Sequence, residues 1–362
     1  MTLVDHLRAA SAGLSKLQAM GLRHLRLRLG TDKSADSLDR EQHLAHGLAW
    51  LSTYGETFAA LSAYAETRSL TEMEKLLVAI AGGEYLNHLL GGIPLNQQEF
   101  IRPHELGLAD DDLADLRANP LRIAGNTVAN RQHLVDLIQQ AQGEMIYGAS
   151  GLAPEIEDMR RTMHRFVADK VKPHAHRWHR DNAYLPLEII EELAGLGVFL
   201  LTLPEQYGGL ALSKQAMCLV SEELSRGWIA VGSLGTRAEI AAELILAGGT
   251  GEQKSKWLPK IASGEILTTA VFTEPNTGSD LGALQTRAKK HGDTYRVTGN
   301  KTWITHPVRA DLMMLLVRTN PGEKGYKGLS MLLAEKTRGS DVAPYPTPAS
   351  RVPRLKSSAI AA

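Results

Sequence analysis

The sequence predicts an α+β protein in which a long helical part precedes a smaller β part. Apolar residues recur at intervals of three and four over much of the chain between His43 and Gly264, as they do in helices with one buried face. From Ile266 to Ala334 the apolar period changes to two, which indicates strands. A chain of 362 residues with 43% hydrophobic content can bury a large core, and its length favours two or three domains.

The sequence predicts an N-terminal helical region over residues 1–150, ahead of the remaining domains. Thr71 and Glu74 form a capping box that begins one helix, and Gly91-Gly92-Ile93-Pro94 ends it. A further helix is expected over 126–143, followed by a linker at 148–151. The helix that begins near His43 is expected to bury one apolar face, made of Leu44, Leu48, Leu51, Tyr54, Phe58 and Leu61.

The sequence predicts a second helical domain over residues 151–265 and a β domain over residues 266–348. Thr250 caps a helix through Gln253, and Gly264 ends that helix. Apolar strands are expected over 311–318 and 328–334, separated by the turn Asn320-Pro321-Gly322.

The composition excludes several classes of function. Forty basic residues balance forty acidic ones, so no strong positive field attracts nucleic acid. Apolar stretches end well before the roughly twenty residues that a membrane span needs, and Met1 to Arg8 have no signal-type apolar core. The single cysteine, Cys218, favours a reducing, cytoplasmic compartment, and a buried position on a helix is expected for it.

Three histidines, His174, His176 and His179, are spaced closely enough to suggest a metal site. No cysteine or clustered carboxylate completes a ligand set, so no metal site is predicted. Pro173 and Trp178 favour a helix end that packs on the core instead.

The segment from Phe272 to Asp280, with the sequence FTEPNTGSD, is the first candidate site. It follows a short apolar strand-like run that begins at Ile266, and it contains turn-forming residues. Gly278 allows backbone N–H groups to approach an anion closely, and Ser279 adds a hydroxyl donor. These groups suit a pyrophosphate.

The second candidate segment is Gly299–Thr305, with the sequence GNKTWIT. The stretch from Tyr295 to Thr305 alternates and is expected to be β-prone. Trp303 offers a flat aromatic face and Thr305 a hydroxyl, so both could stand beside a ring system. A β-hairpin with a Gly-Ser turn and a core tryptophan is the structural alternative for the two segments.

In this order and at this spacing, the two segments resemble the acyl-CoA dehydrogenase family, from about Ala153 to Pro348. The resemblance implies the family's N-terminal α domain over 151–265, its middle β domain over 266–348, and FAD as the cofactor. It implies that Thr273 bonds the pyrimidine edge of the flavin and that Ser279 lies near the phosphates of cofactor and substrate. The FAD-binding residues are then Phe272, Thr273, Gly278, Ser279, Trp303, Ile304 and Thr305, and Ser279 is also the substrate-binding residue.

The helical extension, with Gly91–Leu95 leading to Ile101-Arg102-Pro103, resembles one subgroup of that family. The resemblance implies FAD-dependent α,β-dehydrogenation of a branched, carboxylated acyl-CoA, methylsuccinyl-CoA to mesaconyl-CoA. Electrons would pass to an electron-transfer flavoprotein, and the full-length protein would be a homo-oligomer. The residue that pairs with the free carboxylate of the substrate is not identified. Arg287 and Arg309 are basic candidates, although solvated strand or turn positions are expected for both.

The reaction requires a carboxylate that removes the α proton of the thioester. In the family this base is a Glu in a C-terminal helical domain, which is expected to be missing here. Residues 349–362 are predicted to be an aberrant tail, best explained by a shifted reading frame. No catalytic residue is therefore assigned: Glu205 lies in a loop, and Glu274, like Asp280, is expected to bind turn N–H groups.

The chain is accordingly expected to be an inactive, truncated dehydrogenase. Two alternatives remain open. One is a noncatalytic flavin-domain fragment that acts only in binding or association, and the other is an oxygen-using flavin monooxygenase of the same fold.

Overall fold

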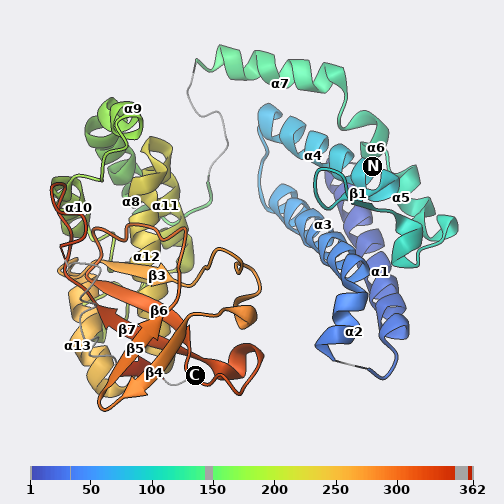
Figure 1. The fold of residues 1–362 in the computed structure, drawn as a ribbon. Helices are drawn as coiled ribbons and strands as arrows, with labels where there is room; N and C mark the ends of the chain where they lie inside the picture. The colour runs from blue at the N-terminus through green and yellow to red at the C-terminus, as the bar shows by residue number, and fades with distance from the viewer. Residues whose placement is uncertain (1, 33, 143–149, 347–357, 361–362) are drawn as a thin grey trace. The chain divides into compact units, whose positions relative to one another are not determined.

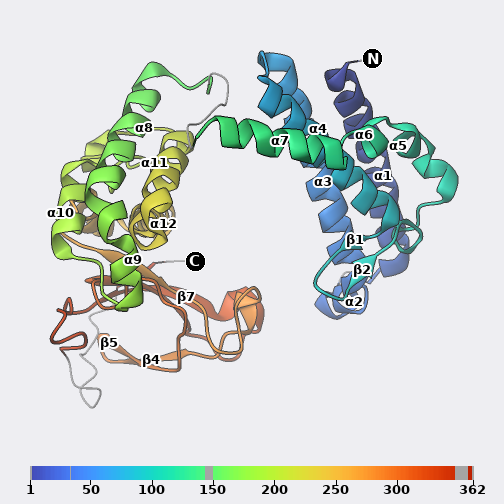
Figure 2. The same cartoon turned by 90° about the horizontal axis from the view of Figure 1, so that it is seen from above.

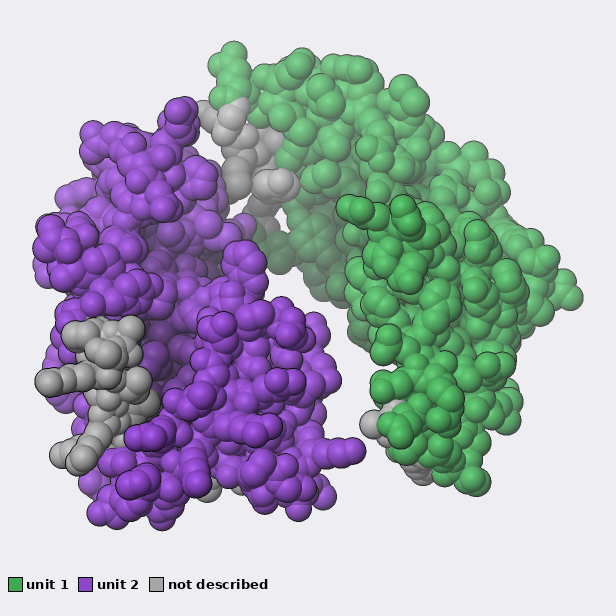
Figure 3. Space-filling view, in the orientation of Figure 1, with its two compact units in different colours: residues 1–151 green, residues 152–362 purple. Residues whose placement is uncertain are grey.

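In the computed structural model the chain divides into two compact units, residues 1–151 and residues 152–362 (Figure 3). The structure describes residues 2–32, 34–142, 150–346 and 358–360. Within these ranges, no helix is both long enough and apolar enough to cross a bilayer.

Unit 1, residues 1–151, consists of helices around one apolar core, in which α1 and α3 pack along each other (Figure 1). Leu7 and Leu14 of α1 are fully buried in this core, as is Phe58 of α3. The short strands β1 (Ile93–Pro94) and β2 (Phe100–Ile101) pair antiparallel. The helices are α1 (Leu3–Leu29), α2 (Ala35–Arg40), α3 (Gln42–Thr67), α4 (Glu72–Gly91), α5 (Ala114–Ala118), α6 (Leu121–Ala124) and α7 (Val128–Gln140).

Most of the local predictions for this unit are confirmed. The side chain of Thr71 accepts a hydrogen bond from the Glu74 N–H, and the Glu74 side chain accepts one from the Thr71 N–H, so the capping box begins α4. The helix ends at Gly91, where Gly92 has a φ of 132° that favours glycine. Helix α7 lies within the predicted range 126–143. The expected linker at 148–151 falls partly outside the described residues.

Unit 2, residues 152–362, places its helices on one side of a mixed sheet (Figures 1 and 2). Thr250 and Gln253 form the predicted capping box of α13, and Gly264, with a φ of 72°, follows the end of that helix. Trp178 packs against the helical core and its ring lies 5.6 Å from that of Trp228, as expected for this helix end. The helices are α8 (Pro154–Phe166), α9 (Lys172–Arg180), α10 (Leu187–Gly195), α11 (Lys214–Gly227), α12 (Ile229–Gly248) and α13 (Gly251–Ala262).

The sheet is built around strand β6, which pairs antiparallel with β7 and parallel with β3 and β4. β6 and β7 match the two predicted strands to within one residue at each end. Strand β5 is antiparallel to β4, and β8 is antiparallel to β7. The strands are β3 (Thr268–Val271), β4 (Arg287–His291), β5 (Thr294–Thr298), β6 (Leu312–Arg318), β7 (Leu329–Glu335) and β8 (Ser358–Ile360).

The central strand buries side chains on both faces. Leu312 and Met314 of β6 join the core formed with the helices, whereas Leu315 and Val317 join a smaller cluster on the opposite face. This alternation follows from the two-residue period of a strand. Helix α12 therefore lies directly against β3, and the core that it shares with the other helices includes these two residues of β6.

Two expectations are wrong, and a third lies mostly outside the described residues. The expected β-prone stretch from Tyr295 to Thr305 is strand only as far as Thr298, because Gly299 lies against Thr286 and the chain then turns away from β4. Cys218 of α11 is exposed, not buried, because it lies on the helix face away from Ala216 and Val220. The predicted aberrant tail lies mostly outside the described residues, apart from β8.

Candidate functional site

The fold brings the two candidate segments together at the end of β3. The Thr302 N–H donates to the carbonyl oxygen of Thr273 at 3.0 Å. Further back along β3, the hydroxyl of Thr269 donates to the Thr305 carbonyl oxygen at 2.6 Å. These bonds hold residues 299–305 beside residues 272–279, as the prediction of one joint site requires.

Lys301 is the third link between the two segments. Its ammonium donates to the carbonyl oxygen of Phe272 at 2.7 Å and to Oε1 of Glu274 at 3.0 Å, and its side chain is only 10% exposed. A buried ammonium needs several acceptors to offset its lost hydration, and these two supply them. Lys301 therefore fixes the loop after β5 to the strand end that carries Thr273.

Glu274 is a structural carboxylate, as expected from the sequence. It accepts hydrogen bonds from the backbone N–H groups of Gln285 at 2.7 Å and Thr286 at 2.8 Å. Burial raises its pKa, but the hydrogen bonds from Thr286, Gln285 and Lys301 outweigh burial and hold the pKa at about 2. The same role was expected for Asp280, but its exposed carboxylate accepts no hydrogen bond from another described residue.

Several donors of the two segments have no acceptor among the described residues. The hydroxyls of Thr273, Ser279 and Thr305 form no hydrogen bond with another described residue, in contrast to that of Thr269. The N–H groups of Gly278 and Ser279 also have no acceptor within the described part of the chain. A Cβ added to Gly278 would meet no atom of the described chain within 4 Å. The turn therefore offers open space lined with donors, which suits an anion.

Trp303 projects from the loop into solvent. Its side chain is 89% exposed, and its φ of 58° lies in the left-handed region, which is rare for a bulky residue. Such strain is found where the surrounding contacts impose it, commonly at functional sites. The structural alternative of a core tryptophan is thus wrong, and the indole is available to a partner.

A histidine that the sequence did not indicate as a site residue, His306, directly follows Thr305. His306 has a φ of 54°, and its Nε2 shares a 3.0 Å hydrogen bond with Oγ of Ser233 on α12. Burial of the ring lowers the pKa of His306 to about 4, a hydrogen bond with the Ala230 backbone opposes this, and the positive charge of Arg237 adds to it. The imidazole is therefore neutral at pH 7 and ties the loop to α12.

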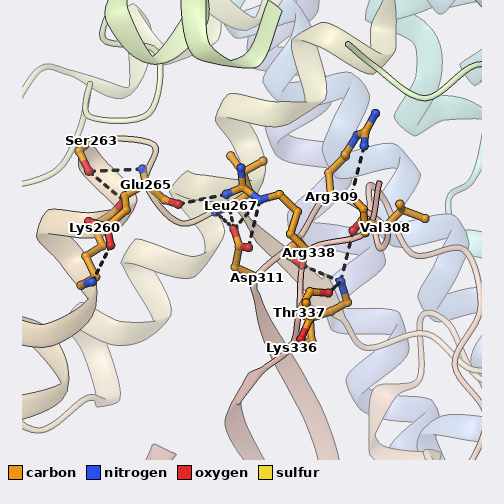
Figure 4. A network of polar contacts seen from close by, with 12 residues as sticks. Lys260, Ser263, Glu265, Leu267, Val308, Arg309, Asp311, Lys336, Thr337 and Arg338 are labelled. Atoms are coloured by element: carbon orange, nitrogen blue, oxygen red, sulfur yellow. Dashed lines mark hydrogen bonds and ion pairs between the residues drawn. The ribbon is translucent and has the colours of Figure 1, made fainter. Parts of the chain in front are cut away.

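A polar network holds the start of β3 and the start of β6 in register (Figure 4). The Leu267 N–H donates to the Asp311 carboxylate at 2.9 Å, and the Asp311 N–H donates to the Leu267 carbonyl oxygen at 2.8 Å. Arg338 donates to the same carboxylate at 3.0 Å and to the carbonyl oxygen of Glu265 at 3.0 Å. The network thus positions the strand that carries Thr269 and leads to Thr273.

Arg309 belongs to this framework and is not solvated, contrary to expectation. It is 3% exposed, pairs with Asp341, and donates to the carbonyl oxygens of Gly339 at 3.2 Å and Leu185 at 3.3 Å. Gly339 and Asp341 belong to the segment after β7, whereas Leu185 lies just before α10, and Asp341 balances the charge. Arg287, on β4, is exposed as expected.

Comparisons with known proteins define the class. Residues 153–265 match the family model "Acyl-CoA dehydrogenase, N-terminal domain", and residues 269–352 match "Acyl-CoA dehydrogenase, middle domain". Together these matches cover more than half of the chain. The chain belongs to the acyl-CoA dehydrogenase family, whose enzymes are oxidoreductases.

Among its relatives, (2S)-methylsuccinyl-CoA dehydrogenase of Cereibacter sphaeroides is 51% identical over 96% of this chain and 65% of its own length. Isovaleryl-CoA dehydrogenase of Bos taurus is 36% identical over 52% of this chain and 46% of its own length. The crystal structure of an acyl-CoA dehydrogenase from Geobacillus kaustophilus is 33% identical, covers 52% of this chain and 50% of its own, and has a TM-score of 0.49. The chain spans less than two thirds of the length of these curated relatives.

The residues of the site fit FAD, the cofactor of this family. A flavin needs a flat neighbour for its ring, donors for its polar edge and a cradle for its pyrophosphate. Trp303, the free hydroxyls of Thr273 and Thr305, and the open Gly278-Ser279 turn supply groups of each kind.

Proposed function

We propose that this chain forms the flavin-binding part of an acyl-CoA dehydrogenase that converts methylsuccinyl-CoA to mesaconyl-CoA. The observation that carries the proposal is the joining of residues 272–279 to residues 299–305 through Thr273, Thr302 and Lys301, two segments that hold several donors without a partner among the described residues. Membership of the family and the 51% identity to (2S)-methylsuccinyl-CoA dehydrogenase support it.

Each site residue has a role that its environment supports. FAD, when bound, is the electron acceptor that makes α,β-dehydrogenation possible. Thr273 would donate to the pyrimidine edge, and Gly278 and Ser279 would bind phosphate oxygens, with Ser279 also near the substrate. Phe272 and Ile304 are partly buried, and together with Trp303 they would hold the ring. The cofactor-binding set is Phe272, Thr273, Gly278, Ser279, Trp303, Ile304 and Thr305.

The thioester must also lose its α proton to a carboxylate that is free to accept it. Glu274 is unsuitable, because a carboxylate with a pKa of about 2 and three donors around it is a weak base. No base is assigned among the described residues. An electron-transfer flavoprotein as the acceptor of electrons, a homo-oligomeric assembly and a cytoplasmic location remain predictions.

The Glu274 carboxylate already accepts hydrogen bonds from Gln285, Thr286 and Lys301, so it is not available as a base. This favours a second candidate function, in which the chain binds FAD and an acyl-CoA without turnover. The two candidates differ in one observable. Both require FAD binding, but only the dehydrogenase bleaches the flavin and releases mesaconyl-CoA.

The test is an anaerobic titration of the FAD-loaded chain with methylsuccinyl-CoA. Flavin absorbance and the acyl-CoA products are followed together, with isovaleryl-CoA as the comparison thioester. Bleaching with formation of mesaconyl-CoA supports the dehydrogenase. A perturbed but unbleached flavin spectrum supports the noncatalytic binder, and a chain that retains no FAD contradicts both.

A further inference from the structure

The loop that ends the second segment has an uncommon backbone conformation. Trp303 has a φ of 58° and His306 a φ of 54°, so two residues with large side chains lie in the left-handed region within four positions. Contacts between Cβ and the backbone disfavour this region for most residues other than glycine. Such a conformation persists only where the surrounding structure imposes it.

The contacts that impose it come from two elements on either side of Thr305. The carbonyl oxygen of Thr305 accepts the 2.6 Å hydrogen bond from Thr269 of β3, and Nε2 of the next residue, His306, lies 3.0 Å from Oγ of Ser233 on α12. The carbonyl oxygen of His306 also accepts a hydrogen bond from the Ala310 N–H at 3.1 Å. The backbone around Thr305 is thus fixed, whereas its hydroxyl has no acceptor among the described residues.

The hydrogen bond between His306 and Ser233 has one consistent direction. The Ser233 hydroxyl carries a single proton and donates it to the carbonyl oxygen of Ala230 at 3.2 Å. Nε2 of His306 is therefore assigned as the N–H donor, and Oγ accepts through a lone pair. Burial lowers the pKa of His306 to about 4, so the ring is neutral at pH 7. The imidazole is a fixed donor at this position, and it does not exchange protons near neutral pH.

The cavity beside His306 leaves no room for a substrate. It has a volume of about 10 Å³ and is also lined by Phe199, Leu234 and Ala238 of the helical core. A cavity of that size holds one water molecule at most. This favours a role for His306 through its neighbour in the chain, Thr305, over direct contact with an acyl group.

We propose that His306 is a positioning residue for flavin reduction, because its imidazole, bonded to Ser233, holds the Thr305 hydroxyl in place beside the flavin ring. The proposal rests on the proposed function, since it assumes that FAD binds beside Thr305. A hydroxyl that is fixed before the reaction stabilises developing charge without reorganisation, whereas a hydroxyl on a mobile loop must first be ordered. Ser233 and His306 then act on the ring only through Thr305.

The reduction of bound FAD tests the proposal without requiring turnover. The FAD-loaded chain is reduced in equilibrium with a reference dye of known potential, and absorbance gives the ratio of oxidised to reduced flavin. Flavin ring nitrogens change from acceptors to N–H donors on reduction, so a neighbouring hydroxyl bonds differently to the two states. Thr305→Val should shift this ratio by about twofold to tenfold, the range for one hydrogen bond. Ser233→Ala should shift the ratio in the same direction by a smaller factor.

The double variant Ser233→Ala/Thr305→Val separates a positioning role from an independent one. It should have the same ratio as Thr305→Val alone, because the hydroxyl that Ser233 helps to place is then absent. His306→Gln keeps an N–H donor of similar reach and should stay closer to wild type than His306→Leu. Ser221→Ala removes a partly buried hydroxyl from α11 and is the matched control, which should leave the ratio unchanged.

The outcomes that overturn the inference also show what else fails. If Ser233→Ala keeps the wild-type ratio or shifts it the other way, or if the double variant departs further than Thr305→Val, the positioning role is wrong and the proposed function stands. If Ser233→Ala and His306→Leu lower only the urea unfolding midpoint, His306 is purely structural. If Thr305→Val keeps the wild-type ratio, its hydroxyl does not act on the ring and the inference fails. If the chain retains no FAD, the proposed function fails together with this inference.

Discussion

Lys301→Met tests whether one buried cation holds the two halves of the site together. The pKa of Glu274, lowered from 4.5 to about 2, corresponds to about 3 kcal/mol of stabilisation of its ionised form. Lys301 is one of three groups that donate to this carboxylate, so its removal costs about 1 kcal/mol there. The lost bond to the Phe272 carbonyl oxygen adds about 1 kcal/mol. Lys301→Met should therefore destabilise unit 2 by about 2 kcal/mol.

The assay is urea unfolding of the FAD-free chain at pH 7, followed by tryptophan fluorescence. Four of the five tryptophans lie in residues 152–362, so this signal reports mainly on unit 2. Lys289→Met is the matched control, since Lys289 is exposed on β4. The double variant with Glu274→Gln should be less destabilised than the sum of the single variants, because the two side chains interact directly. A midpoint for Lys301→Met equal to that of Lys289→Met would refute the reasoning.

Three further predictions concern single groups of the site. The folded-state pKa of Glu274 is depressed, so its ionised form stabilises the fold above pH 4.5, and this stabilisation is lost as the pH falls towards about 2. Acid titration followed by circular dichroism should show a steeper loss of folded protein for wild type than for Glu274→Gln. Trp303→Ala should weaken FAD binding in equilibrium dialysis without changing the unfolding midpoint of the FAD-free chain, because the indole is 89% exposed. In a catalytically competent protein, Thr305→Val should slow flavin reduction in stopped-flow measurements by about tenfold to a hundredfold. By contrast, Thr269→Val should lower the free energy of unfolding by about 1 kcal/mol, because it loses the hydrogen bond to the Thr305 carbonyl oxygen.

Features that depend on local chemistry were predictable from the sequence. The capping boxes at Thr71 and Thr250 need only a residue three positions further on, and both form. Strands β6 and β7 are mostly apolar and bury side chains on both faces of the sheet, so their period and length identified them.

Features that depend on distant partners were not predictable in the same way. Residues 299–305 have β-prone composition, but bonds from Thr302 and Lys301 to the end of β3 impose a loop instead. Arg287, Arg309 and Arg237 are one residue type in three environments: exposed, buried with an aspartate, and half-buried with no carboxylate partner among the described residues. Only the packing of α12 and of the segment after β7 separates them.

The most direct measurement of the central claim is a titration of the FAD-free chain with FAD, followed by tryptophan fluorescence, for wild type and Trp303→Phe. If the two segments form the flavin wall, FAD should saturate at one per chain, and much of the quenching should disappear in the variant, because Trp303 lies against the ring. No saturable quenching in the wild type, or the same quenching in Trp303→Phe, would show that the flavin does not bind beside these two segments.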